Sequence, residues 1–188
     1  AASRATEDYH REHHDHLPDE ARPAGGPVRT RPLYDRLQAR GAVFGARFGW
    51  ERPLWFAPEP GAADAYSFRR GSWHDAVGRE CRTVRSAAGL LDQTSFAKYE
   101  VSVRGAEALL DRLCANRLPA ERGRLALTQM CTPNGGIVCD LTVTRLSEDA
   151  FYLVSAAATE AHDVGWIRAH APDDGSVRIE NVTARTGC

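Results

Sequence analysis

Long apolar runs and glycine-rich nucleotide motifs are both absent from this sequence of 188 residues. No run approaches the roughly 20 apolar residues that a membrane-spanning helix needs. No G-x-G-x-x-G fingerprint occurs, so a dinucleotide-binding unit is not predicted. The net charge is -1 and no basic amphipathic stretch occurs, which argues against nucleic acid and membrane surfaces as partners.

Cysteines are few, odd in number and never spaced as C-x-x-C: Cys81, Cys114, Cys131, Cys139 and Cys188. A disulfide framework or a cysteine-based zinc site is therefore not expected. Cys131 and Cys139 could face each other across a hairpin, although cysteine in a strand is also a small apolar core residue. Residues 1–22 are charged and lack the apolar core of a signal peptide, so we expect reduced thiols and a cytoplasmic location.

Four histidines lie close together near the start of the chain: His10, His13, His14 and His16. The spacing of the first three puts them on one side of a helix, which would suit a metal ion. A solvated helix end that leads into Pro18 explains the same residues, and we favour it, so no metal site is predicted. The Pro- and Gly-rich residues 23–27 then indicate a linker.

The middle of the chain is less regular than its second half. Residues 32–61 are rich in aromatics and glycine but keep neither helical nor strand periodicity for long. Residues 72–91 predict a helix, because apolar residues recur at helical spacing and Ser72 can cap its start with Asp75 three positions on.

From residue 97 onward, strand and helix patterns alternate. We expect strands at 97–103, 124–131, 137–146, 150–156 and 176–182, and helices at 105–116 and 160–170, the second capped by Thr159. Ala97, Tyr99, Val101 and Val103 would share one strand face. The turn signal Pro-Asn-Gly-Gly at 133–136 joins two strands into a hairpin. This order predicts an α+β fold, an antiparallel or mixed sheet with helices on one face.

Asp140 is unusual because it lies inside a strand-forming run, where aspartate is depleted. Alternation puts it on one face with Val138, Thr142 and Thr144, directly after a glycine turn. Taken alone, the residue is better explained as a solvated carboxylate or one paired with an arginine, because exposed carboxylates are common.

Five segments resemble one known family. The segments GGIVCDLTV at 135–143 and LLDQTSFAKYEV at 90–101 are similar to aminomethyltransferases of the glycine cleavage system, the T-protein. The segments GAVFG (41–45) with FGWERP (48–53), and DRLCANRLP (111–119), resemble the dimethylglycine/sarcosine dehydrogenase branch of that family. The resemblance extends over about residues 8 to 183.

The resemblance implies a fragment of a folate-dependent, N-demethylating amine dehydrogenase of one-carbon metabolism. Residues 1–31 would be the tail end of an upstream FAD-dependent oxidoreductase region with its linker. Residues 32–188 would be the N-terminal part of a folate-binding, aminomethyltransferase-like domain. FAD would be held only in the missing upstream region, so the fragment alone is expected to lack dehydrogenase activity. Tetrahydrofolate would capture the one-carbon unit here.

By the same resemblance, Asp140 aligns with the family's catalytic aspartate. A carboxylate near the folate N10 amine can orient it or accept its proton. Phe96 and Val154 align with folate-contacting positions, and Ala156 lies where glycine-cleavage members carry Asn. The implied small-molecule partners are folate and a methylated amine, whose identity stays open together with the oligomeric state. The alternatives are a non-catalytic folate-binding or scaffold module of the same fold, and an inactive truncated product.

Overall fold

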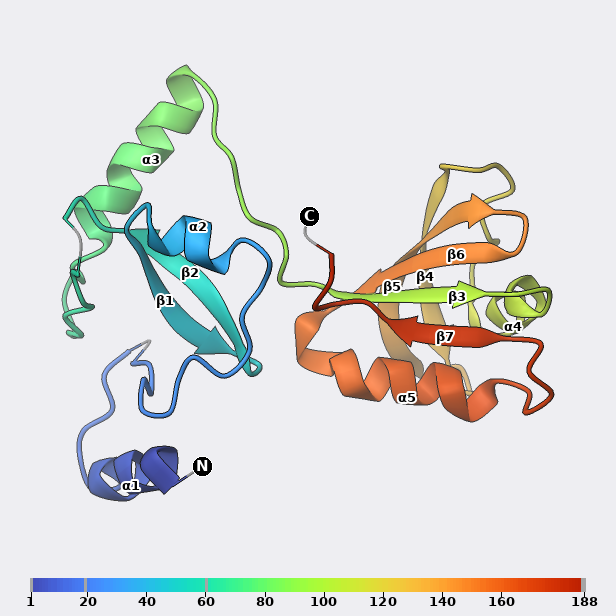
Figure 1. Ribbon diagram of the computed structural model, residues 1–188, viewed down its shortest axis with the longest axis horizontal. Helices are drawn as coiled ribbons and strands as arrows, with labels where there is room; N and C mark the ends of the chain where they lie inside the picture. Colours follow the sequence, from blue (N-terminus) through green and yellow to red (C-terminus); the bar gives the residue numbers. More distant parts are fainter. Residues whose placement is uncertain (1, 19, 60, 187–188) are drawn as a thin grey trace. The chain divides into compact units, whose positions relative to one another are not determined.

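The computed structural model describes residues 2–186 except 19 and 60, and it divides into two compact units (Figure 1). Unit 1 is Ala1–Asp92 and unit 2 comprises Gln93–Thr186. The division expected between residues 31 and 32 separates two functional regions, whereas the division at residues 92 and 93 separates two compact units. The functional division stays a prediction. In the described part of the chain, no helix is both long and apolar enough to span a membrane.

Unit 1 is built around a β-hairpin that the sequence pattern did not predict. Its helices are α1 (Ala2–Arg11), α2 (Tyr34–Gln38) and α3 (His74–Ser86), and its strands are β1 (Ala42–Arg47) and β2 (Trp50–Phe56). The two strands pair antiparallel, with a register shift at Val43/Phe44 and Pro53 opposite Phe44. The shift and the proline interrupt the period of two by which a strand is recognised.

The turn of this hairpin consists of Phe48 and Gly49, both with positive φ (52° and 81°). Two such residues between Arg47 and Trp50, which pair with each other, give the turn type that matches the twist of a hairpin. Asn-Gly is the usual sequence signal for that turn. A Phe-Gly pair does not predict it, so the turn could not be recognised from the sequence. Residues 29–31 pack on the hairpin, with the guanidinium carbons of Arg29 and Arg31 lying 3.8 and 4.4 Å from the Trp50 ring.

Helix α3 is shorter than predicted, and its expected cap is wrong. It covers His74–Ser86 instead of 72–91, and no side chain caps its first turn. The Ser72 hydroxyl instead donates to Asp64 Oδ1 at 3.4 Å and accepts from the Ala65 amide at 3.2 Å. Ala76 is its only fully buried residue, so little packing supports a longer helix.

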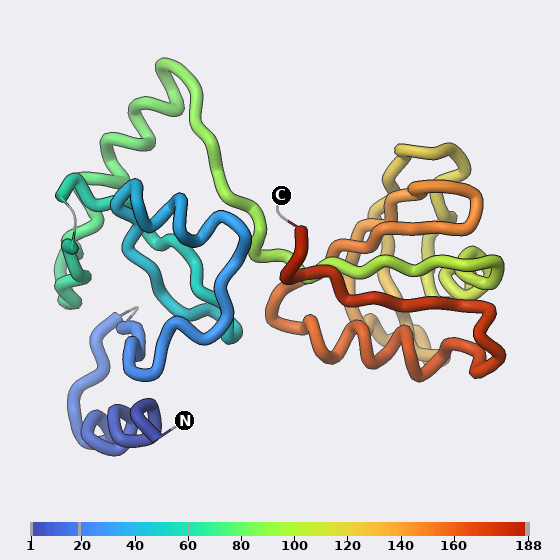
Figure 2. The backbone as a smooth tube through the Cα atoms, viewed as in Figure 1, coloured from blue at the N-terminus to red at the C-terminus, as the bar shows by residue number. Residues whose placement is uncertain are grey.

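Unit 2 has the element order that the sequence predicted, an α+β arrangement with one antiparallel sheet. The strands are β3 (Ala97–Ser102), β4 (Leu125–Cys131), β5 (Ile137–Ser147), β6 (Ala150–Ser155) and β7 (Arg178–Asn181). The helices are α4 (Ala106–Leu113) and α5 (Glu160–His170), the latter after a short 3-10 turn, η1 (Ala157–Thr159). The strand order is β4-β5-β6-β3-β7, and Figure 2 shows β3 running between β6 and β7. The predicted hairpin of β4 and β5 is confirmed.

One face of this sheet forms the core of unit 2. Both α4 and α5 pack on that face, and the buried cluster includes Tyr99, Val101, Leu141, Val143, Phe151, Leu153, Leu109, Leu110, Leu113, Val164 and Ile167. The predicted inward face of Ala97, Tyr99 and Val101 is confirmed, since all three are fully buried. Val103 does not belong to it, because β3 ends at Ser102 and Val103 turns the chain with a φ of 81°.

Four of the five cysteines are described and are free thiols, and Thr159 does not cap α5 with its side chain. Cys114 and Cys139 are buried, Cys81 is exposed, and these three and Cys131 are free. Cys139 pairs with Met130 and Cys131 with Ile137, so the two cysteines do not face each other. No side-chain cap bond is made by Thr159; its hydroxyl binds Asp163 and Ala156 instead. Cys188 lies outside the described residues.

Candidate functional site

The sheet of unit 2 has a second face, opposite the one on which α4 and α5 pack. Cys139, Leu141 and Val143 of β5 point into the core, so the alternate residues of that strand point away from it. We call this surface the open face and define it by Asp140, Thr142 and Thr144 of β5 with Tyr152 and Val154 of β6. None of these residues is fully buried.

Asp140 lies on the open face, as its alternation with core residues predicted. It is exposed and pairs with Gln129 across β4 and β5. Over the described residues, no hydrogen bond or ion pair engages its carboxylate, so the predicted alternative of an Arg partner is not what the structure shows. An unengaged carboxylate keeps all its acceptor positions for a ligand.

Val154 lies on the same face, in the adjacent strand. It pairs with Thr142 on one side and with Lys98 on the other, which makes a row of side chains across β5, β6 and β3. Asp140 is two residues from Thr142, so it is the diagonal neighbour of Val154, at about 7–8 Å in antiparallel geometry. The structure therefore brings these two predicted residues together.

Phe96 lies directly before β3 and is 42% exposed. The Lys98 ammonium group, which is buried, donates to the carbonyl oxygens of Thr94 and Phe96, each at 3.1 Å. Charge-assisted bonds of this kind hold the turn before β3 in place. Ser155 pairs with both Leu141 and Ala97, so the next residues along, Asp140 and Phe96, belong to the same end of the sheet.

Gln129, Thr142 and Lys98 were not predicted as site residues from their own chemistry, although they neighbour Asp140 and Val154. Each becomes visible only through the strand register, because a residue's cross-strand partner depends on how two distant segments are aligned. The alternation within each strand was readable in the sequence, but the alignment between strands was not.

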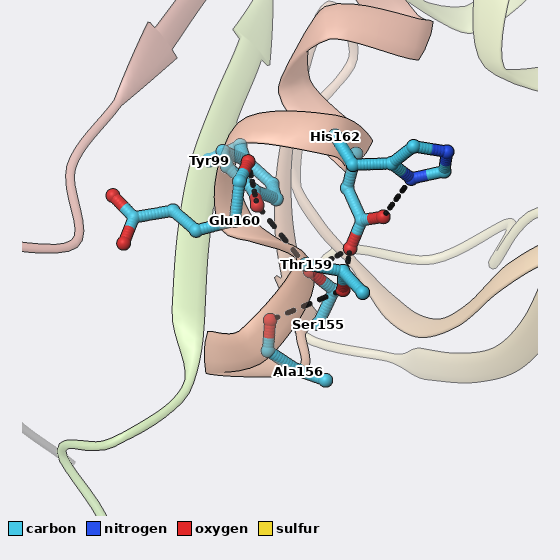
Figure 3. A network of polar contacts seen from close by, with 7 residues as sticks. Tyr99, Ser155, Ala156, Thr159, Glu160 and His162 are labelled. Atoms are coloured by element: carbon cyan, nitrogen blue, oxygen red, sulfur yellow. Dashed lines mark hydrogen bonds and ion pairs between the residues drawn. The ribbon is translucent and has the colours of Figure 1, made fainter. Parts of the chain in front are cut away.

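A network of buried polar groups lies on the core side of the same strand ends (Figure 3). Asp163 Oδ2 accepts hydrogen bonds from Ser155 Oγ and Thr159 Oγ1, both at 2.7 Å, and Oδ1 lies 3.1 Å from Nδ1 of His162. Tyr99 donates its hydroxyl to the Glu160 carbonyl at 2.9 Å. Burial raises the pKa of the Tyr99 phenol, and the charges of Asp163 and Glu160 raise it further. The network therefore holds a neutral phenol together with Asp163, a residue that is only 1% exposed.

The described residues of unit 1 line two cavities. One, of about 320 Å³, has aromatic and charged walls that include Trp55, Tyr66, Trp73, Arg47, Arg69 and Asp64. The other, of about 390 Å³, is lined by His10, Arg11, His14, Asp15, His16 and Glu20. Neither is lined by Asp140, Phe96 or Val154, which lie on a sheet surface.

The histidine segment offers no preformed metal centre. His10, His13 and His14 are exposed, and Arg11 forms an ion pair with Glu20 beside them. Over residues 2–186, with 19 and 60 left aside, no group of three or more His, Cys, Asp or Glu side chains is placed to hold a metal ion.

Residues 33–188 match the family described as "GCVT N-terminal domain". The match takes in α2, the hairpin of unit 1 and all of unit 2, so it includes Asp140, Phe96 and Val154.

Several curated proteins are similar to the chain. "Dimethylglycine dehydrogenase, mitochondrial" of Rattus norvegicus is 37% identical over 174 residues, which cover 90% of the chain and 20% of that protein. "Pyruvate dehydrogenase phosphatase regulatory subunit, mitochondrial" of Mus musculus is 33% identical, over 85% of the chain and 19% of that protein. The "Aminomethyltransferase" of Bacillus subtilis (strain 168) is 31% identical, over 82% and 37%. The chain thus spans about a fifth of the length of the first two.

A solved structure has a similar fold. The crystal structure of glycine cleavage system aminomethyltransferase T from Bartonella henselae matches with a TM-score of 0.60 and 25% identity. The match covers 81% of the chain and 37% of that protein. The expected cytoplasmic location stays a prediction.

Proposed function

The chain belongs to the family of GCVT N-terminal domains, and from this premise we propose that its open face binds tetrahydrofolate for the transfer of a one-carbon unit. The observation that carries the proposal is the unengaged Asp140 carboxylate at the end of the sheet that also carries Val154 and Phe96. Bound tetrahydrofolate would supply the nucleophilic amine that takes up the one-carbon unit. Asp140 would orient that amine and accept its proton.

The residues present suit such a ligand. A reduced pterin with its aminobenzoyl group is flat and largely apolar, with polar atoms at its edges. Phe96 is an exposed aromatic ring and Val154 is a half-buried apolar side chain, so both can contact an apolar ring system. Asp140, Thr142 and Gln129 provide acceptors and donors around them.

The whole reaction involves more than this chain. We infer that it acts within a longer protein that oxidises a methylated amine, as the name of the rat dehydrogenase indicates for that relative. Flavin chemistry is not assigned to these residues, because the sequence contains no G-x-G-x-x-G. Their part is to receive the one-carbon unit, and the choice of amine belongs elsewhere.

A second candidate function is a non-catalytic module of the same fold. The mouse relative, named as a regulatory subunit, supports it, since that similarity covers most of the chain. The two candidates differ in what they require of Asp140. A catalytic site needs its carboxylate, whereas a binding or regulatory module needs only the shape of the open face.

Binding is tested by titrating tetrahydrofolate into the isotope-labelled chain and following its amide NMR signals. NMR titration detects binding even at millimolar affinity. A weakened site is therefore still observed if other parts of a longer protein complete it. We expect saturable shifts at Asp140, Thr142 and Val154. Shifts confined to other surfaces, or none at millimolar tetrahydrofolate, would refute the proposal.

The role of the carboxylate is tested by Asp140→Asn, with Asp149→Asn as the matched control. Asp149 is exposed in the turn at the other end of β5. Loss of a hydrogen bond to a charged group is expected to weaken binding about 10- to 100-fold at Asp140, with no change at Asp149. Equal binding by both variants and the parent chain would favour the non-catalytic candidate.

In an active longer protein, Asp140→Asn is expected to slow formation of methylenetetrahydrofolate about 10²- to 10⁴-fold. Flavin reduction by the amine should stay nearly unchanged, and released formaldehyde should rise because the one-carbon unit is no longer captured. Both are measured on one preparation. Equal loss of oxidation and transfer would assign Asp140 a structural role.

A further inference from the structure

The polar network drawn in Figure 3 lies at the end of β6 marked by Ser155, next to η1 and the start of α5. Its residues are Tyr99 of β3, Ser155 of β6, Thr159 of η1 and Asp163 of α5, and we call it the Asp163 network. Ser155 occupies a special position in it, because it pairs with Leu141 of β5 on one side and with Ala97 of β3 on the other. One hydroxyl therefore joins α5 to the meeting point of three strands.

Asp163 is well suited to hold that point. The residue is 1% exposed, and its carboxylate accepts hydrogen bonds from both Ser155 and Thr159, so its burial is compensated by short, charge-assisted bonds. It also lies in the first turn of α5, where the helix N-terminus favours a negative charge. The ionisable groups near it are His162 and Glu160 of its own helix, Tyr99 of β3 and Cys139 of β5, while β6 presents the neutral Ser155.

The strand ends held by this network carry the candidate site on their other face. Asp140 is one residue from Leu141, and Phe96 is one residue from Ala97, the two partners of Ser155. Neighbouring residues of a strand point to opposite faces, so a bond on the core face fixes the backbone from which the next side chain leaves the open face. Small displacements of a catalytic group reduce rates strongly.

We propose that Asp163 is a positioning residue that acts through Ser155 to fix the direction of the Asp140 carboxylate and of Phe96. This inference rests on the proposed function of the open face. Asp163 itself lies on the core side, so it touches no ligand there.

The test replaces Ser155 by Ala in the full 188-residue chain. This removes the bond between strand and helix, but leaves Asp163 with Thr159 and His162 and leaves Tyr99 with the Glu160 carbonyl. Glu107→Gln is the matched control. It weakens the ion pair of Glu107 with Arg145, which lies toward the other end of β5. Where Ser155→Ala fails to fold, Ser155→Cys keeps the volume and weakens the bond.

Two measurements need no ligand. Amide hydrogen exchange at Lys98, Leu141 and Val154 is expected to become about tenfold faster in the Ser155 variant, beyond any change at distant core amides. The carboxyl carbon NMR signal of Asp140, which reports that side chain's own surroundings, is expected to move. The Glu107 control should do neither. Uniform loosening of unit 2, or an unmoved Asp140 signal, would overturn the positioning role.

A third measurement adds tetrahydrofolate. The Ser155 variant is expected to bind it about tenfold more weakly than the parent chain, while the control binds it equally well. If the parent chain shows no binding but the two ligand-free changes occur, the proposed function fails and the network's hold on Asp140 is upheld. If the variant binds as tightly as the parent, the positioning role fails and the proposed function survives.

Discussion

The two units differ more in what they bury than in how much regular structure they contain. In the described part of unit 1, the buried apolar side chains are Trp50, Trp55 and Ala76, whereas unit 2 has a continuous cluster from both helices and four strands. Unit 1 leaves Phe68, Leu90 and Leu91 exposed by 66% or more. Helices and a hairpin thus give little stability unless their apolar faces meet, so unit 2 should dominate the stability of the chain.

Thiol reactivity gives the largest expected contrast between the units. Burial raises the pKa of Cys139 to about 12, with the Asp163 charge adding to it, and raises that of Cys114 to about 11. Cys81 of unit 1 is exposed. Because the thiolate is the reactive form, Cys139 should be alkylated at pH 8 about 10³-fold more slowly than Cys81.

Iodoacetamide labelling followed by mass spectrometry measures these rates. In urea, Cys81, Cys114 and Cys139 should react alike, which controls for local sequence. Similar rates for Cys81 and Cys139 in the folded chain would mean that the core of unit 2 opens far more readily than its burial indicates.

A pair of leucine substitutions sharpens the comparison. Leu110 of α4 is 0% exposed, so Leu110→Ala is expected to lower the free energy of unfolding by about 2–5 kcal/mol. Leu91 of unit 1 is 66% exposed, so Leu91→Ala should change it by less than about 0.5 kcal/mol. Urea unfolding followed by circular dichroism gives both values. Equal costs would show that Leu91 is covered in solution.

The smallest expected effect concerns the core of unit 1. Trp50 is 1% exposed, and the guanidinium groups of Arg29 and Arg31 stack over its ring in cation–π contacts. Trp50→Phe should cost about 1–2 kcal/mol locally, by weaker cation–π contact and a small void. Trypsin cleavage after Arg29 should therefore become faster. Trp73→Phe is the control, since Trp73 is 41% exposed. Unchanged cleavage in both would mean that Trp50 does not hold residues 29–31.

The fold could be predicted where its signals are local. In unit 2, alternation and the turn at 133–136 gave the strands of the β4–β5 hairpin to within a residue or two. In unit 1, the bulge at Val43/Phe44 and Pro53 disturbed the alternation, and the hairpin was missed. Helix α3 was predicted too long because residues 87–91 continue its apolar spacing but are not packed in it.

The candidate site was predictable only in part, because here too only local signals can be read from the sequence. Asp140 stood out because a carboxylate in a strand interior is unusual, and its face followed from alternation. Phe96 and Val154 came only from resemblance to a family, and their roles stay predictions. Asp163 gave no signal, because the value of a buried carboxylate depends on Ser155 and Thr159 reaching it in three dimensions.

Val103 shows where this chain gives up stability to change direction. It turns the backbone between β3 and α4 with a φ of 81°, and its carbonyl accepts the Ala106 amide at 2.8 Å. A β-branched residue in this left-handed region is strained by about 1–2 kcal/mol, which glycine would not be. The packing of the core of unit 2 offsets this strain energy, so the fold is kept. Val103→Gly would relieve that strain but would add conformational freedom to the unfolded chain and remove a partly buried side chain, so this turn balances backbone geometry against chain entropy.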